Sequence, residues 1–164
     1  MTLNFDTIRK NVADKREKEN TANAKRNLDR IAFLNKCQSD MQKEFREWLV
    51  ANEPDFTRSI ETRGTLNTDG SISLKMGYDD TFKLAWSKIC HKYERMVSSK
   101  YIRTDGFDAS EDFRDTPAWK EWLADSGISI SYSTYTVTEE QFDGDGNERP
   151  DKHIQMPLWI ISKV

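Results

Sequence analysis

Residues 28–51 read LDRIAFLNKCQSDMQKEFREWLVA, and this stretch carries the clearest helical pattern in the chain. Large apolar side chains recur three and four residues apart, which places them on one face of an α-helix. That face consists of Leu28, Ile31, Leu34, Met41, Phe45, Trp48 and Leu49, with Cys37 close to it. Because the residue before a proline disfavours helical geometry, Asn52 and Pro54 predict that the helix ends near Ala51.

A second helical pattern covers about residues 80–99 and follows a hairpin signal. Asp79 or Asp80 is a suitable N-cap for it. Its apolar face consists of Phe82, Trp86, Ile89, Cys90, Tyr93, Met96 and Val97. Before it, residues 62–78 read TRGTLNTDGSISLKMGY. Within this stretch Asp69-Gly70 is a strong turn signal, so we expect a β-hairpin.

The C-terminal part predicts one short helix and then strands. Thr116 and Pro117 are typical of a helix start, and a glycine at 127 is suited to its end. In the strand that follows, the apolar side chains change face between Tyr132 and Tyr135, and this phase slip predicts a bulge or a strong bend. Residues 154–161 alternate as a strand that is apolar on both faces, and Pro157 requires a free or bulged edge there.

The first 27 residues differ from the rest of the chain. Phe5, Ile8 and Val12 predict a short amphipathic helix over residues 5–13, whereas residues 14–27 contain no large apolar side chain. We expect the latter stretch to be an exposed helix or a flexible linker. The predicted organisation is a charged arm over residues 1–27 and one globular domain over residues 28–164. The fold class is α+β, with antiparallel β-hairpins packed against the two main amphipathic helices.

Charge is distributed unevenly, although the net charge is only −3. Residues 1–103 have a net charge of +5, residues 104–151 have −10 and the last 13 residues have +2. Acids interspersed with aromatic anchors favour a protein partner with a basic surface, such as a nucleic-acid-binding complex. The alternative is that the acids only keep exposed loops soluble. The candidate partner-binding residues are Asp105, Asp108, Glu111, Asp112, Asp115, Trp119 and Trp122.

The N-terminal arm allows two further interpretations. Its first thirty residues hold eight Lys/Arg and five Asp/Glu, so it is able to follow a phosphate backbone. Because acids are interleaved with the bases, a solvated face or a homodimer seam is the alternative. The candidate arm contacts are Phe5, Ile8, Val12, Arg9 and Lys10.

The stretch FDGDGNERPDKH, residues 142–153, matches only the first half of a calcium loop. Asp143, Asp145 and Asn147 occupy the first ligand positions of an EF-hand, but Glu148 replaces the required glycine and Ile154 replaces the bidentate glutamate. We therefore predict a hairpin turn and no metal site. The chain contains no nucleophile elbow, P-loop or dinucleotide motif, so the sequence predicts no cofactor and no catalytic residue.

Cysteine use and hydropathy predict the compartment. Cys37 and Cys90 lie on apolar helix faces, so we expect buried free thiols in a reducing compartment. The first residues lack an apolar signal-peptide core, and no stretch approaches the ~18 apolar residues of a membrane helix. We therefore expect a soluble, cytoplasmic protein.

These features favour a non-enzymatic interaction protein. The charge-polarised composition is typical of small accessory proteins encoded by phages or mobile elements. The sharper hypothesis is an inhibitor whose acidic face, residues 104–151, meets a nucleic-acid-handling complex. The alternatives are a nucleic-acid-binding accessory protein that uses the basic arm, and a metal-dependent enzyme with a site of scattered carboxylates.

Overall fold

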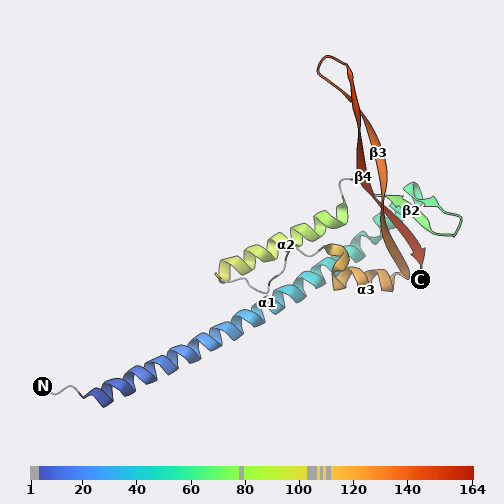
Figure 1. Ribbon diagram of the computed structural model, residues 1–164. Coiled ribbons are helices and arrows are strands. Elements are labelled where there is room, and N and C mark those ends of the chain that lie inside the picture. Colours follow the sequence, from blue (N-terminus) through green and yellow to red (C-terminus); the bar gives the residue numbers. More distant parts are fainter. Residues whose placement is uncertain (1–3, 78–79, 103–106, 108, 110–111) are drawn as a thin grey trace.

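The computed structural model describes residues 4–77, 80–102, 107, 109 and 112–164. These residues form an α+β fold in which three α-helices pack with one four-stranded antiparallel sheet. The fold class predicted from the sequence is confirmed. One long helix and one long β-hairpin extend from the packed body in different directions, so the molecule has two arms (Figure 1).

The longest element is α1, which runs without a break over Phe5–Arg63. Asn4 caps it, because its Oδ1 accepts a hydrogen bond of 3.2 Å from the Thr7 N–H. At about 1.5 Å per residue, the 59 residues of α1 span roughly 88 Å. Residues 14–27 are therefore an exposed helix and not a flexible linker.

The prediction that this helix ends near Ala51 is wrong, because α1 continues through Pro54. A proline inside a helix costs about 3 kcal/mol, since it loses a hydrogen bond and clashes with the preceding turn. The next turn offsets this cost. Phe56 is buried there, with its ring 5.2 Å from that of Phe82 and 5.7 Å from that of Trp122. Tertiary burial thus outweighs a local helix-breaking signal.

The second helix, α2 (Thr81–Lys100), carries the centre of the core. Asp80 caps it by accepting hydrogen bonds from the N–H groups of Phe82 and Lys83, which confirms one of the two predicted caps. The predicted apolar face is buried apart from Met96, which is 42% exposed. Phe82 lies within 5.2–6.2 Å of six other aromatic rings. They belong to Trp48, Phe56, Phe113, Trp119, Trp122 and Trp159.

Only the second half of α1 reaches this core. Leu34 is the first buried residue, whereas Leu28 and Ile31, expected on the buried face, are 67% and 41% exposed. The reason is the length of α2, whose C-cap Tyr101 packs its ring 5.5 Å from that of Phe33. Both cysteines are buried and free of disulfides, as predicted.

The third helix, α3 (Pro117–Asp125), follows the 3₁₀ turn η1 (Phe113–Asp115) and is hydrogen-bonded to α1. Thr116 caps it and proline occupies the first turn, as predicted. The Gln42 side chain of α1 accepts a 3.0 Å hydrogen bond from the Ala118 N–H. Glu53 of α1 accepts one of 3.3 Å from the indole of Trp122. These bonds orient α3 across α1.

The sheet has the strand order β1-β2-β4-β3. The strands are β1 (Thr65–Leu66), β2 (Ile72–Lys75), β3 (Ile128–Phe142) and β4 (Glu148–Lys163). Leu74, Trp159 and Ile161 belong to the core that the helices cover. The ladder between β2 and β4 ends at the Lys75–Leu158 pair, but the Met76 N–H still donates to the Pro157 C=O at 3.0 Å. The predicted free edge at Pro157 is therefore wrong: proline loses only the return bond, because it has no N–H.

Both hairpins are closed by the same turn. The N–H of Gly70 donates to the C=O of Asn67, and the N–H of Asn67 donates to the C=O of Ser71. Residues 143–147 repeat both bonds. Gly70 and Gly146 have φ of 85° and 81°, a conformation that glycine adopts without strain. Each connection is a type I turn followed by a glycine bulge, so both predicted hairpins are confirmed.

The change of face along β3 does not mark a bulge. β3 and β4 pair in continuous register from Ile128 to Glu139, and the register shift lies between Glu139 and Gln141. The predicted bulge between Tyr132 and Tyr135 is therefore wrong, and the alternative of a strong bend stays a prediction. At this point the hairpin leaves the helices. Up to Tyr132 the apolar side chains face the core, and beyond it they occupy the opposite face, because strand side chains alternate.

We expect Phe82→Ala to destabilise the protein by about 3–5 kcal/mol, because it removes a buried ring and leaves a cavity inside the aromatic cluster. Phe5→Ala is the matched control. Its ring is 73% exposed, so the change should stay within about 0.5 kcal/mol. Urea unfolding followed by tryptophan fluorescence measures both. Equal losses in the two variants would contradict a core centred on Phe82.

Candidate functional site

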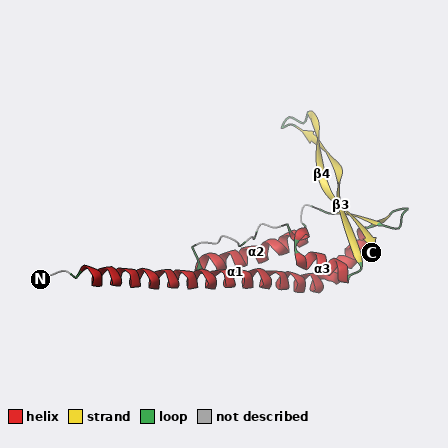
Figure 2. Ribbon diagram, turned by 60° about the horizontal axis from the view of Figure 1, so that its bottom comes forward, coloured by secondary structure: helices red, strands yellow, loops and turns green. Residues whose placement is uncertain are grey.

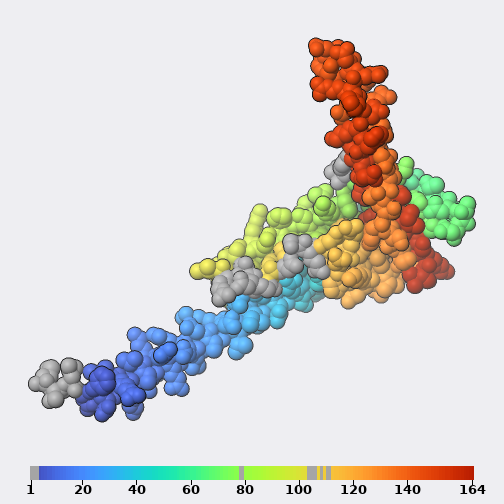
Figure 3. All heavy atoms as spheres, in the orientation of Figure 1, coloured from blue at the N-terminus to red at the C-terminus, as the bar shows by residue number. Residues whose placement is uncertain are grey.

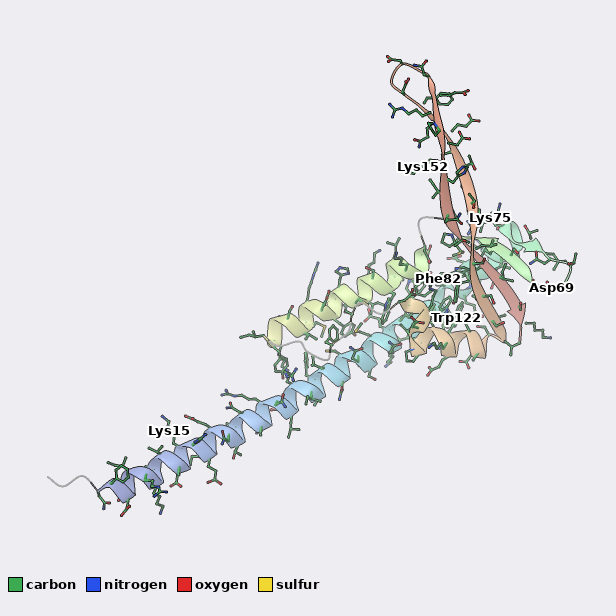
Figure 4. The ribbon with its side chains drawn as sticks, viewed as in Figure 1. Lys15, Asp69, Lys75, Phe82, Trp122 and Lys152 are labelled. Atoms are coloured by element: carbon green, nitrogen blue, oxygen red, sulfur yellow. The ribbon has the colours of Figure 1, made fainter. Side chains whose placement is uncertain are left out.

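The first candidate surface is the helical arm, residues 5–30 of α1. Every side chain from Phe5 to Asp29 is exposed. The arm extends about 39 Å from the body at 1.5 Å per residue, and no other described element lies beside it (Figure 2). Eight Lys/Arg and five Asp/Glu give it a net charge of +3. Lys15 lies on this arm and points into solvent (Figure 4).

The bases of the helical arm gather on one side. Successive residues turn by about 100°, so the face that carries Leu34 and Met41 into the core continues outward along the arm. We call this strip, about 120° wide, the basic face. It holds Phe5, Ile8, Arg9, Val12, Lys15, Arg16, Glu19, Asn23, Arg26, Asn27 and Arg30. The basic face has a net charge of +4, and the rest of the arm has −1.

The predicted arm contacts divide between the two sides of this helix. Phe5, Ile8, Val12 and Arg9 lie on the basic face, whereas Lys10 turns away from it. The three apolar side chains are exposed near the outer end, Phe5 most of all. Helical periodicity thus places most of the unbalanced positive charge on one side of the arm, although acids and bases alternate in the sequence. The same side carries the three apolar residues at its outer end.

The second candidate surface is the hairpin arm, residues 133–157, where β3 and β4 continue beyond the end of β2. It is a two-stranded ribbon of about ten residues per strand, or roughly 33 Å, and it stands away from the body (Figure 3). Six acids and two Lys/Arg give it a net charge of −4. None of these acids forms an ion pair with another described residue. The acids are Glu139, Glu140, Asp143, Asp145, Glu148 and Asp151.

The hairpin arm has an apolar face and a polar face. The apolar face consists of the cross-strand pairs Tyr135 with Met156 and Val137 with Ile154. The polar face carries hydrogen-bonded pairs of 2.8 and 3.1 Å, Thr136 with Gln155 and Thr138 with His153. At the tip the Phe142 ring is 58% exposed. Met156 is only 6% exposed and the Lys75 ammonium lies over the Tyr135 ring, so the apolar contacts that the ribbon offers beside its negative charge are those of Val137, Ile154 and Phe142.

Asp143 organises the turn at the tip of the hairpin arm. Its carboxylate accepts hydrogen bonds of 2.8 and 3.0 Å from the N–H groups of Asn147 and Asp145, and one of 3.2 Å from Asn147 Nδ2. These bonds, that of the Asn147 N–H above all, lower the pKa of Asp143 below its usual value. Among the described residues, no three His, Cys, Asp or Glu side chains gather closely enough to hold a metal ion.

The acids predicted for partner binding have different positions. Three of them, Asp105, Asp108 and Glu111, lie outside the described residues. Asp112 caps η1 and accepts hydrogen bonds of 3.0 and 2.6 Å from Nε and Nη2 of Arg114. This pairing lowers the pKa of Asp112 and balances its charge locally. Asp115 is exposed.

Trp119 and Trp122 are core residues, which corrects their prediction as partner anchors. They are 1% and 2% exposed, and their ring centroids lie 5.2 Å apart. Each indole N–H has an internal acceptor: the Tyr132 hydroxyl at 2.7 Å for Trp119, and Glu53 for Trp122. Trp122 lies inside the body below Phe82 (Figure 4). The short helix α3 buries its apolar side, so these rings are not available to a partner.

A groove of about 620 Å³ lies between α2, η1 and the base of the hairpin arm. Its lining combines apolar side chains such as Trp86 with charged ones such as Lys83. Of the three carboxylates that line it, those of Asp80 and Asp112 already have partners, and the third belongs to Glu94. Asp80 caps α2, with a pKa that burial raises, and Asp112 pairs with Arg114. The groove has the size of a small-molecule site, but the arms present far more unbalanced charge.

No protein-family model, curated protein or solved structure matches this chain. Within the described part of the chain, no helix is long and apolar enough to span a membrane. Sequence reasoning placed the acidic face at residues 104–151 without singling out the acids of the hairpin arm. The signal that would have found these acids is the length of β3 and β4. Both strands are much longer than β2, so the acidic end of their hairpin has no third strand beside it.

The turn at the tip predicts a pH dependence. Because the pKa of Asp143 is lowered in the folded state, its contribution is present above the unfolded value of 3.8 and disappears as pH falls through the lower folded pKa. We expect the NMR shift of the Asn147 amide to titrate with a midpoint below 3.8. Asp143→Asn keeps an acceptor oxygen and should abolish this titration. A midpoint at or above 3.8 would contradict the assigned hydrogen bonds.

Proposed function

We propose that this protein is a non-enzymatic interaction protein that binds a macromolecular partner through a charge-polarised surface. The observation that carries the proposal is the hairpin arm. Six acids lie on a ribbon that stands away from the core, and none is balanced by an ion pair within the described residues. A projecting surface with a net negative charge attracts a partner of the opposite sign from a distance.

The shape of the hairpin arm supports a concave partner surface. A two-stranded ribbon is narrow, and its exposed tip carries Phe142 next to Asp143 and opposite Glu148. In a basic groove the carboxylates would meet Lys and Arg side chains, and the apolar face with Tyr135 would exclude water beside them. Charge complementarity of this kind mainly sets the association rate and the choice of partner.

The partner class that fits best is a nucleic-acid-handling complex. Such proteins line a groove with Lys and Arg to hold phosphates. Carboxylates spaced along a ribbon can occupy that groove in place of phosphates, which would make this protein an inhibitor. The acidic face then lies on the hairpin arm rather than on Asp112, whose charge Arg114 balances.

Charge reversal on the hairpin arm tests this function. Glu140→Lys, Asp145→Lys and Asp151→Lys together leave the turn residue Asp143 and the cross-strand pair of Glu139 intact. We expect the wild-type protein to retain a partner from a lysate of its source cells. The partner should elute between about 0.1 M and 1 M salt, over which the Debye length falls from about 10 to 3 Å. The reversed variant should retain none of it.

The matched control is Asp14→Lys, Glu17→Lys and Asp29→Lys, which makes the same change of net charge on the helical arm. It should capture the partner as the wild-type protein does. Added duplex DNA or RNA should displace the partner if its groove normally holds nucleic acid. Capture that persists in the hairpin-reversed variant, or that ignores salt, would sink the proposal.

The basic face supports a second candidate function, direct binding of nucleic acid. Its net charge of +4 lies along one side of a straight helix, a form that follows a phosphate backbone. Arg9→Glu, Arg16→Glu and Arg26→Glu should then abolish a gel shift of a short duplex. Lys10→Glu, Lys18→Glu and Lys25→Glu change the charge equally on the other side and should weaken it far less. Equal loss in both variants would exclude the basic face as the contact.

A further inference from the structure

The two arms carry opposite charges but do not meet within one molecule. The helical arm leaves the body at one end of α1, and the hairpin arm rises from the sheet at the other end (Figure 1). Both views show the tips of the arms far apart (Figure 2). Any contact between a basic face and a hairpin arm must therefore involve two copies of the chain.

The basic face lies on the same side of α1 that packs against α2 in the body, but in the helical arm this side is not covered. In the body it carries Leu34, Cys37 and Met41, which are buried beside α2. The cover stops where Tyr101 packs on Phe33 at the end of α2. Beyond this point the same side of α1 runs on for about 39 Å to the exposed ring of Phe5.

The properties of the two surfaces are complementary. The basic face has a net charge of +4, and the hairpin arm has −4. Their lengths are similar, about 39 Å for the helix and 33 Å for the ribbon. Each surface combines charge with exposed apolar groups, Phe5 and Val12 on one and Phe142 on the other.

We propose that the hairpin arm of one copy lies along the basic face of a second copy. The acids of the ribbon then face the arginines of the helix, while the apolar residues near the tips cover each other. If both arms of each copy take part, the contact is made twice about a two-fold axis and gives a closed dimer. If only one contact forms between each two copies, it is heterologous and builds a ring or a chain. The inference uses the same hairpin arm as the proposed function but does not depend on the outside partner.

Charge also argues against a simpler dimer in which two helical arms pair. Phe5, Ile8 and Val12 are the only large apolar side chains on the basic face of the arm. A parallel pair would join them but would also bring two faces of +4 together. An antiparallel pair would set the apolar tip of one arm against the arginines of the other. The hairpin arm supplies both negative charge for the arginines of the basic face and an apolar contact for its exposed apolar side chains.

The test is a charge swap between purified copies, followed by sedimentation velocity. The arm-reversed variant carries Arg9→Glu, Arg16→Glu and Arg26→Glu, and the hairpin-reversed variant carries Glu140→Lys, Asp145→Lys and Asp151→Lys. At about 0.1 mM protein, enough to populate a micromolar contact, the wild-type chain should associate at low salt and dissociate near 1 M salt. Each variant alone should be monomeric, because its two arms then have the same sign. An equimolar mixture should associate again.

The recovery in the mixture is the deciding result. Misfolding of a variant would not produce it, because the mixture still contains one unaltered basic face and one unaltered hairpin arm. The off-face variant with Lys10→Glu, Lys18→Glu and Lys25→Glu should still associate. A wild-type chain that is monomeric at low salt, a mixture that stays monomeric, or association that nuclease treatment abolishes would each overturn the inference. A monomeric chain that still captures an acid-dependent partner would leave the proposed function standing, so the two failures are distinguishable.

Discussion

The structure depends on the packing of Phe82 against the aromatic rings around it. This side chain of α2 contacts rings from α1, η1, α3 and β4. Aromatic pairs at these distances contribute about 0.5–1.5 kcal/mol each beyond the area they bury. Because the cluster draws a ring from each of these elements, it determines how α3 and the sheet sit on α1. It also explains the persistence of α1 through Pro54, since Phe56 on the following turn is one of its members.

The helical arm and the hairpin arm are the two segments that contribute no side chain to this aromatic cluster. The core uses Trp119 and Trp122, the rings that looked most suited to an interface, and satisfies their indole groups internally. The arms are left with charged side chains and a few exposed apolar residues near their ends. Contacts made by such surfaces are steered by charge and weakened by salt. Binding of an outside partner and contact between copies would share this property, so they would compete for the hairpin arm.

Local rules were sufficient for much of the fold. Asp80 and Thr116 cap their helices, and the glycines of both turns adopt positive φ, because these choices depend on neighbouring residues alone. The helical stripe of α2 was readable for the same reason. The overall separation of charge was also readable, but the acids of the hairpin arm were not distinguished from those near Asp112. That distinction depends on the extent of β2, which leaves the acids of the hairpin arm without a neighbouring strand.

Secondary structure, capping, turn chemistry and gross charge follow from residues close together in the chain, so the amino-acid order alone determined them. Four features depended on distant parts of the molecule: the passage of α1 through Pro54, the exposure of Leu28 and Ile31, the change of face along β3, and the burial of the tryptophans of α3. Each of these features depends on which other elements pack over a side chain and bury it. The answer comes from the length of α2, the extent of β2 and the position of Phe82, because burial free energy is set by the neighbours that tertiary packing supplies.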